Sequence, residues 1–184
     1  TVLKNGDLVV LPTDTIYGIV AVATNISAVQ KLDTAKQRPD GYPYIILISS
    51  IDELSLFGVY LDQNIKSTLE KIWPAPVSIV LKTNHFDSSY LGATDSLAFR
   101  LPNSPKLLEL IKKTGPLVAP SANTSGQPTA TTIAKAQDYF GQKVSLYIPA
   151  ETEPLVGQAS TLVDFTSPSP KILRAGTVKL DNLW

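Results

Sequence analysis

Short runs of β-branched and other apolar residues recur along the whole chain, and capped helical patterns separate many of them. The runs predict β-strands at residues 8–11, 44–49, 77–82, 96–101, 117–119, 144–148, 161–165 and 171–174. Helices are predicted at residues 26–36, 62–73, 104–113 and 132–140. No helical pattern lies between the strands at 77–82 and 96–101, so the chain favours a mixed sheet over a strictly parallel one.

The length and composition favour one globular domain. The 184 residues can form one proper core, and we expect a single domain over residues 1–184. Apolar residues make up 43% and charged residues 17% of the chain, a balance typical of folded proteins. The sequence has no apolar stretch of the roughly 20 residues that span a bilayer and no secretory leader pattern. We therefore expect a cytoplasmic protein that does not use a membrane.

Several classes of chemistry are excluded by composition. The chain has no cysteine, which rules out disulfides, thiol nucleophiles and thiolate metal sites. Its one histidine, His85, lies in a predicted loop and does not support a histidine metal cluster or a Ser-His-Asp triad. The formal net charge is zero, so any contact with RNA would depend on a local basic patch.

Four polar segments with proline or glycine lie at or near the ends of predicted strands, where α/β sheets form ligand sites. They are residues 12–18, 36–39, 119–126 and 159–161. Their hydroxyl and amide groups can hydrogen-bond a polar ligand, and their small residues leave backbone N–H groups open to anions. Each segment alone could also be an ordinary turn, because these residue types form turns in any protein.

Arginine is rare in this chain, which has thirteen lysines and three arginines. Arg38, Arg100 and Arg174 all lie at or near predicted strand ends. The planar guanidinium fork suits carboxylate and phosphate, so three converging forks could hold one polyanion. Surface ion pairing is the alternative role for each arginine alone. The sequence contains no Walker-type or Gly-x-Gly-x-x-Gly phosphate loop, and its residues by themselves predict an anion-binding α/β domain without identifying a reaction.

Five short strings, in their order and spacing, resemble the YrdC-like family of threonylcarbamoyl-adenylate synthases. They are Leu-Pro-Thr-Asp-Thr-Ile-Tyr-Gly, Lys-x-Arg-Pro, Ser-Ala-Asn-x-Ser-Gly, Ser-Thr-x-Val-Asp and Ile-Leu-Arg-x-Gly, and the likeness runs from Gly6 to Gly176. The resemblance implies an α/β (α+β-like) domain with a twisted mixed β-sheet and flanking helices around a deep basic cavity. It also implies the short form of the family, without the extra C-terminal domain of longer members.

The resemblance further implies a nucleotidyltransferase reaction. L-threonine, bicarbonate and ATP would give threonylcarbamoyl-AMP and pyrophosphate, with Mg²⁺ on the ATP phosphates and no metal ligand from the protein. The product would pass to a separate transferase partner that modifies adenosine beside the anticodon of tRNA. Direct binding of tRNA or double-stranded RNA is compatible with this pathway.

The site residues are carried over from the family by position. The residues expected to hold threonine are Thr15, Tyr17, Arg100, Ala119 and Ser160. The residues expected to hold ATP are Arg38, Tyr42, Ser96, Ser121, Asn123, Thr129 and Arg174. Lys36 and Arg38 of the Lys-x-Arg element are the expected catalytic residues. No side chain is an obvious general base near neutral pH, so positioning and charge neutralisation are expected to provide most of the catalysis.

Four positions depart from the family pattern. Leu47 replaces a threonine-contacting histidine, Ala75 a glycine, Ala159 a glutamate and Ala175 a proline. Two alternatives to the synthase follow. The first is a paralogue with an altered acyl substrate or without activity. The second is a non-catalytic RNA-binding module for RNA or ribosome maturation, against which the zero net charge and the lack of an aromatic stacking stripe argue.

Overall fold

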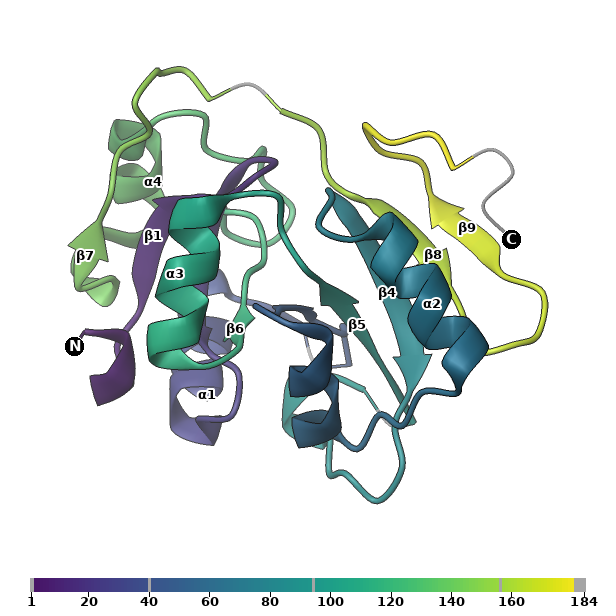
Figure 1. Ribbon diagram of the computed structural model, residues 1–184. Helices are drawn as coiled ribbons and strands as arrows, with labels where there is room; N and C mark the ends of the chain where they lie inside the picture. Colours follow the sequence, from purple (N-terminus) through teal and green to yellow (C-terminus); the bar gives the residue numbers. More distant parts are fainter. Residues whose placement is uncertain (1, 40, 94, 156, 181–184) are drawn as a thin grey trace.

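The computed structural model describes residues 2–39, 41–93, 95–155 and 157–180. In these ranges the strands are β1 (Val9–Pro12), β2 (Tyr17–Val22), β3 (Ile45–Leu47), β4 (Val77–Lys82), β5 (Ser96–Arg100), β6 (Leu117–Val118), β7 (Leu146–Tyr147), β8 (Thr161–Asp164) and β9 (Lys171–Arg174). The α-helices are α1 (Ile26–Lys36), α2 (Gln63–Ile72), α3 (Pro105–Thr114) and α4 (Ile133–Phe140). Short 3₁₀ turns connect several of these elements (Figure 1).

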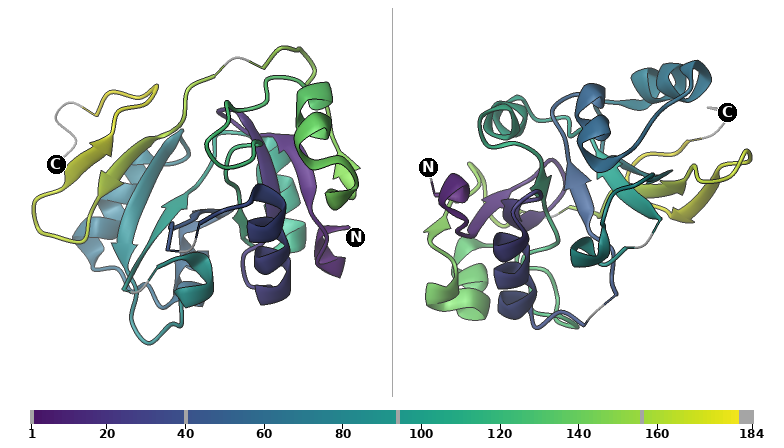
Figure 2. Two further views of the ribbon diagram at one scale, coloured as in Figure 1. Left: turned by 180° about the vertical axis from the view of Figure 1, so that it is seen from behind. Right: turned by 90° about the horizontal axis from the view of Figure 1, so that it is seen from below.

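The strands form one mixed sheet in the order β7-β1-β2-β6-β3-β5-β4-β8-β9. The pairs β1/β7, β3/β5 and β4/β8 are parallel, and the pairs β1/β2, β2/β6, β3/β6, β4/β5 and β8/β9 are antiparallel. β4 and β5 are direct antiparallel neighbours, as expected for strands without a helix between them. The prediction of an α/β domain with a twisted mixed sheet is therefore confirmed (Figure 2).

The α-helices begin where the sequence predicts because a polar side chain caps each one. Asn25, Asp62, Ser104 and Thr132 each accept a hydrogen bond from the backbone N–H three residues further along. Such a bond satisfies one of the N–H groups that lack a partner inside the helix. All the predicted strands are present as well, several of them shorter than predicted.

The sequence prediction missed β2. The residues of Tyr17–Val22 are buried on both faces of the sheet, so they form a continuous apolar run instead of an alternating pattern. Val20 and Val22 belong to the core cluster of Leu107 and Ile111 from α3. The alternate residues Tyr17, Ile19 and Ala21 belong to the larger core cluster. β2 thus lies inside the sheet, between β1 and β6, with both faces covered.

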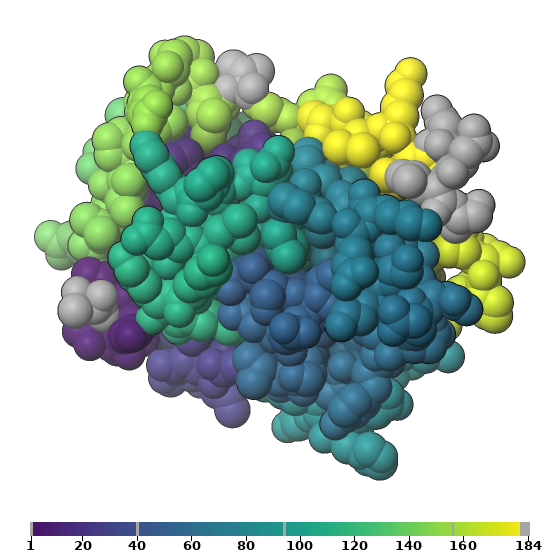
Figure 3. Space-filling view, viewed as in Figure 1, coloured from purple at the N-terminus to yellow at the C-terminus, as the bar shows by residue number. Residues whose placement is uncertain are grey.

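Helices cover both faces of the sheet. α3 lies on one face, and α1 and α4 lie on the other (Figures 1 and 2). α2 lies on the same side as α3, and the two helices cover much of the surface seen in Figure 3. None of the helices in the described ranges has the length and apolar character that crossing a bilayer demands.

Candidate functional site

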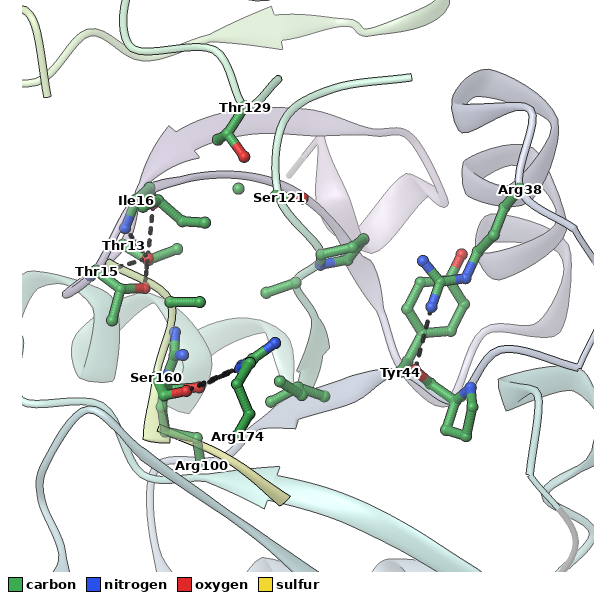
Figure 4. A pocket seen from close by; sticks show the side chains of 16 residues that line it. Thr13, Thr15, Ile16, Arg38, Tyr44, Arg100, Ser121, Thr129, Ser160 and Arg174 are labelled. Carbon is green, nitrogen blue, oxygen red and sulfur yellow. Dashed lines mark hydrogen bonds between the residues drawn. The ribbon is translucent and has the colours of Figure 1, made fainter. Parts of the chain in front are cut away.

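A cavity with a volume of about 290 Å³ lies among the strand ends (Figure 4). Its walls consist of Thr13, Thr15, Ile16, Gly18, Arg38, Pro43, Tyr44, Ile45, Arg100, Ala119, Pro120, Ser121, Thr129, Ala159, Ser160 and Arg174. All four of the polar segments found in the sequence contribute to this wall. The three arginines also converge on it, which confirms the prediction drawn from their rarity.

The turn between β1 and β2 forms one wall. Thr13 Oγ1 donates a hydrogen bond to the carbonyl of Ile16 at 2.7 Å and accepts from the backbone N–H groups of Thr15 and Ile16 at 3.2 Å. Thr13 Oγ1 and Thr15 Oγ1 lie 2.9 Å apart. Either hydroxyl can be the donor in this pair, and the Thr15 hydroxyl lies on the cavity wall, where it can bond a polar ligand.

Arg100, at the end of β5, is a buried cation on the cavity wall. Its Nη2 lies 3.0 Å from Asp14 Oδ1, and the side chains of Arg100 and Asp14 are 5% and 3% exposed. Burial lowers the pKa of Arg100, while Asp14 raises it and Arg174 lowers it further. Arg100 Nε has no hydrogen-bond partner among the described residues. The guanidinium of Arg100 therefore has hydrogen-bonding capacity that Asp14 does not use.

Arg174, at the end of β9, is held against the residues that precede β8. Its Nε and Nη2 donate to the Ser160 carbonyl at 3.2 and 3.0 Å, and Nη2 lies 3.2 Å from Ser160 Oγ. A Cβ atom on Gly176 would lie 2.3 Å from Thr161 N and 2.4 Å from Ala159 O. The two backbones therefore pack directly together, which is why glycine follows this arginine two residues later.

Arg38 follows α1 and lies on the far wall of the cavity (Figure 4). Its Nη2 donates to the carbonyls of Tyr42 and Pro43 at 3.2 and 3.1 Å. The guanidinium carbon lies 4.3 Å from the centre of the Tyr44 ring. Ser121 and Thr129 lie on the wall between Arg38 and the β1–β2 turn (Figure 4).

Lys36 lies behind the wall instead of lining the cavity. Its side chain is buried, and Nζ donates to the carbonyls of Ser121 and Asn123 at 2.6 Å each. Burial, and then the charge of Arg38, lowers the pKa of this ammonium to about 7. This placement corrects the prediction that Lys36 touches a substrate, because the side chain is used to fix the loop that carries Ser121.

Tyr17 is likewise a core residue and does not wall the cavity. Its side chain is fully buried. Its hydroxyl donates to Glu153 and accepts from the backbone N–H of Ala150. Burial and then the bond to Glu153 raise the pKa of the phenol. The prediction that Tyr17 contacts threonine is therefore corrected, because its polar end already has protein partners.

The remaining predicted residues surround the cavity. The Asn123 side-chain amide donates to the carbonyls of Thr124 and Gln127 at 2.9 and 2.8 Å, so it shapes its own loop instead of lining the cavity. Ser96 lines a second hollow of about 410 Å³ that shares Pro43 with the cavity. The Tyr42 ring is exposed beside Arg38, 5.9 Å from the guanidinium carbon.

The four departures from the family pattern fall in different surroundings. Ala159 lines the cavity. Leu47 is fully buried in the apolar cluster under α3, so its side chain belongs to the core. Ala75 packs against the larger core cluster, and Ala175 is exposed. Of these four residues, Ala159 is the one that changes the cavity wall.

The cavity offers few ligands for a resident metal ion. Within the described ranges, no group of three or more His, Asp or Glu side chains could hold a metal. The wall carries hydroxyl and guanidinium groups, whereas Mg²⁺ in proteins is usually bound through one or two carboxylates together with substrate phosphates. Among the described residues, the donor set of the cavity wall therefore does not fit a metal ion held by protein side chains.

Several residues that line the cavity are not among the predicted site residues. Thr13, Ile16 and Pro120 lie inside segments that the sequence marked as candidates. Tyr44 and Ile45 had no such signal, because an apolar or aromatic residue at the start of a strand normally belongs to the core. Their position beside Arg38 and Ala119 depends on the pairing of β3 with β6, which no local pattern specifies.

Fold and cavity together define an α/β domain that can bind an anionic ligand among arginine and hydroxyl groups. A family model with the name Sua5/YciO/YrdC and the description telomere recombination matches residues 1–176. The chain belongs to this family, as the resemblance in its sequence strings indicates.

Characterised relatives are similar over nearly the whole chain. A threonylcarbamoyl-AMP synthase from Pyrococcus abyssi is 33% identical over 98% of this chain and 54% of that protein. Another from Pseudoalteromonas translucida is 31% identical over 89% of both chains. The crystal structure of P. abyssi Sua5 complexed with L-threonine has 33% identity and a TM-score of 0.85, and the match covers 95% of this chain and 52% of that one. The chain thus spans about half the length of the Pyrococcus relative.

Proposed function

We propose that this chain forms threonylcarbamoyl-AMP and pyrophosphate from L-threonine, bicarbonate and ATP. The observation that carries the proposal is the convergence of Arg38, Arg100 and Arg174 on one cavity of about 290 Å³. The relatives named threonylcarbamoyl-AMP synthase support this reaction. The threonine in the crystal structure of one relative supports the amino acid substrate.

Threonine binds on the Arg100 side of the cavity. The guanidinium of Arg100 binds the threonine carboxylate, because this buried cation lines the cavity and favours an anionic acceptor. The Thr15 hydroxyl is placed to meet the amine or hydroxyl of the substrate. Ser160, whose hydroxyl is already bonded to Ser78 and Arg174, forms the wall beside it. Ala119 contributes a small apolar wall.

ATP binds across the cavity from Arg38 to Arg174. The two guanidinium groups neutralise the phosphates, and the hydroxyls of Ser121 and Thr129 lie on the wall of the same cavity. The adenosine extends past Pro43 and Tyr42 to the second hollow, which Ser96 lines. Mg²⁺ would enter on the phosphates as part of the nucleotide, since the described residues of the wall offer it no carboxylate.

The reaction joins three small reactants in two steps. The threonine amine, after losing its proton to solvent, attacks the carbon of bicarbonate, and water leaves to give the N-carboxylate. A carboxylate oxygen then attacks the α-phosphorus of ATP while the bond to pyrophosphate breaks. Among the described residues, the cavity wall carries arginine and hydroxyl groups and no carboxylate or imidazole, so orientation and charge neutralisation lower the barrier. Orientation alone can contribute roughly 7–11 kcal/mol in favourable cases.

The product is a reactive mixed anhydride, so a second enzyme must consume it. We assign that role to a transferase that moves the threonylcarbamoyl group to adenosine in tRNA, in the cytoplasm. We further propose that this chain itself binds tRNA, which does not depend on the synthase reaction. It predicts a salt-sensitive affinity for tRNA in the absence of ATP, measured by filter binding.

A paralogue with a different acyl substrate is the second candidate. Ala159 favours it, because this residue lines the cavity where the family pattern has glutamate. A panel of amino acids in place of threonine separates the two. If another amino acid gave product faster than threonine, that amino acid would be the substrate and the paralogue would be favoured. A strict requirement for threonine would support the synthase.

The central test is an assay with MgATP, bicarbonate and labelled threonine. We expect a labelled adenylate and pyrophosphate, both dependent on all three reactants. Arg38→Ala and Arg100→Ala should abolish the product. Lys112→Ala, which removes an exposed cation from α3, should leave product formation unchanged. Pyrophosphate formed without threonine would contradict the proposed order.

A further inference from the structure

The Arg38 guanidinium lies over the face of the Tyr44 ring. The guanidinium carbon is 4.3 Å from the ring centre, and Tyr44 itself is 2% exposed. Arginine over an aromatic face at this distance is attracted by the ring quadrupole, more strongly where water is excluded. The ring thus covers one face of the guanidinium, and the carbonyls of Tyr42 and Pro43 hold one of its edges. The rest of the group points into the cavity (Figure 4).

Asp33 of α1 holds the Tyr44 ring through a hydrogen bond to its hydroxyl. The Tyr44 hydroxyl donates to Asp33 Oδ1 at 2.5 Å. The backbone carbonyl of Asp33 accepts a bond from Arg38 N at 3.0 Å. One residue of α1 therefore fixes both the aromatic ring and the start of the arginine. A phenol that donates to a carboxylate also gains electron density in its ring, which strengthens its attraction for a cation.

We propose that Tyr44 is a positioning residue for Arg38. Its ring holds the Arg38 guanidinium with the open edge of that group toward the anion in the cavity. The proposal rests on the proposed function in that the anion is the triphosphate of ATP. Arginine has a long side chain with many rotamers, and ordering it on ligand binding would lower affinity. The ring and its Asp33 partner provide this order before ATP binds. Tyr44 acts through Arg38, so its effect on ATP should disappear when Arg38 is absent.

The first experiment measures the order of Arg38 without any ligand. The protein has three arginines, so its Nε–Hε spectrum is simple to assign by single substitution. In Tyr44→Leu we expect a lower order parameter and a changed chemical shift for Arg38 Nε, and unchanged values for Arg100. Equal order of Arg38 in the wild type and in Tyr44→Leu would overturn the proposal.

The second experiment measures MgATP affinity by calorimetry. Tyr44→Leu should weaken binding about tenfold, as expected for the loss of a partly desolvated cation–π contact. Tyr44→Phe keeps the ring and loses only the bond to Asp33, so a change of about twofold is expected. In an Arg38→Ala background, Tyr44→Leu should have little further effect. An undiminished tenfold effect in that background would assign Tyr44 a direct role and contradict positioning.

A matched control separates positioning from general loss of packing. Phe57 is fully buried and packs against Phe86 and Phe99 outside the cavity. Phe57→Leu should lower the melting temperature as Tyr44→Leu does, yet keep the wild-type MgATP affinity and Arg38 order. If the wild type failed to bind MgATP while Arg38 still lost order in Tyr44→Leu, the proposed function would be wrong and the positioning role would be supported.

Discussion

Asp14 and Arg100 form a buried ion pair just under the cavity wall. The distance between Arg100 Nη2 and Asp14 Oδ1 is 3.0 Å, and both side chains are almost fully buried. Asp14 also accepts from the backbone N–H of Asn103 at 3.3 Å. Asp14 belongs to the turn between β1 and β2, and Arg100 to the end of β5. The pair therefore links the two halves of the sheet at the point where the candidate site lies.

Asp14→Asn should destabilise the fold strongly. Removing one partner of a buried ion pair leaves the other charge uncompensated and typically costs about 3–5 kcal/mol. We expect a loss of this size in the free energy of unfolding, measured with urea. Asp7→Asn is the control, because Asp7 pairs with Lys31 at 3.4 Å between side chains that are 39% and 54% exposed. Exposed pairs contribute at most about 1 kcal/mol, and similar losses for both variants would contradict the structural role of the Asp14 pair.

Arg100→Lys should weaken threonine binding while the protein stays folded. Lysine retains the charge but loses the planar fork, so it cannot pair with Asp14 and a substrate carboxylate in the same geometry. Losing one hydrogen bond between charged groups lowers affinity by roughly tenfold or more. Calorimetry with threonine measures this change. MgATP affinity serves as the internal control, and an equal fall in both affinities would indicate a general disruption of the cavity.

Lys36 should make the stability of the protein depend on pH above neutrality. Burial lowers the pKa of Lys36 to about 7, whereas lysine in the unfolded chain titrates near 10.4. Between these values the unfolded state binds more protons, so the free energy of unfolding rises with pH. Wild type should therefore gain stability relative to Lys36→Met as the pH rises from 7 to 10, in urea titrations.

The control for this pH dependence is Lys112→Met on the surface of α3. Its ammonium is in water in both states, so this variant should follow the wild-type profile. A constant difference between the wild type and Lys36→Met at every pH would show that Lys36 remains charged in the folded protein. A neutral Lys36 still has two N–H groups for its two carbonyl acceptors.

Gly157→Ala should damage the threonine subsite. A Cβ atom at this position would lie 1.8 Å from the carbonyl oxygen of Thr15, so the backbone must shift. Overpacking of this kind costs about 1–3 kcal/mol and should displace the Thr15 hydroxyl. Gly126→Ala is the control, because its φ of +78° is unfavourable for alanine but no neighbouring atom lies within 4 Å. Both variants should have a lower melting temperature. Gly157→Ala alone should also bind threonine more weakly.

The helices and most strands of this fold could be predicted because each carries a local signal. Asn25 and Thr132 cap helices that begin where predicted, and the strands of the second half of the chain are short apolar runs between polar turns. β2 was missed because it begins inside the segment 12–18, which we treated as a candidate ligand turn. Its last residues form an unbroken apolar run, which periodicity alone does not assign to a strand.

The sequence predicts which segments form the candidate site better than it predicts which side chains of those segments line the cavity. The rarity of arginine identified three residues that do converge, because the physical need for a planar fork is independent of tertiary structure. Lys36 and Tyr17 lie in the correct segments but turn away from the cavity to bond Ser121 and Glu153. Side-chain direction at the end of a strand or helix depends on neighbours from other segments, and the sequence does not contain that information locally.

The residues of the cavity wall come from positions as far apart in the chain as Thr13 and Arg174, and they adjoin strands from β1 at one side of the sheet to β9 at the other. No fragment that lacks either half can assemble the complete set of contacts. Ligand binding and global folding are therefore linked, and saturating ligand should raise the midpoint of the entire unfolding transition. Binding of substrate can then report whether a newly synthesised chain has paired all the strands that hold the cavity wall.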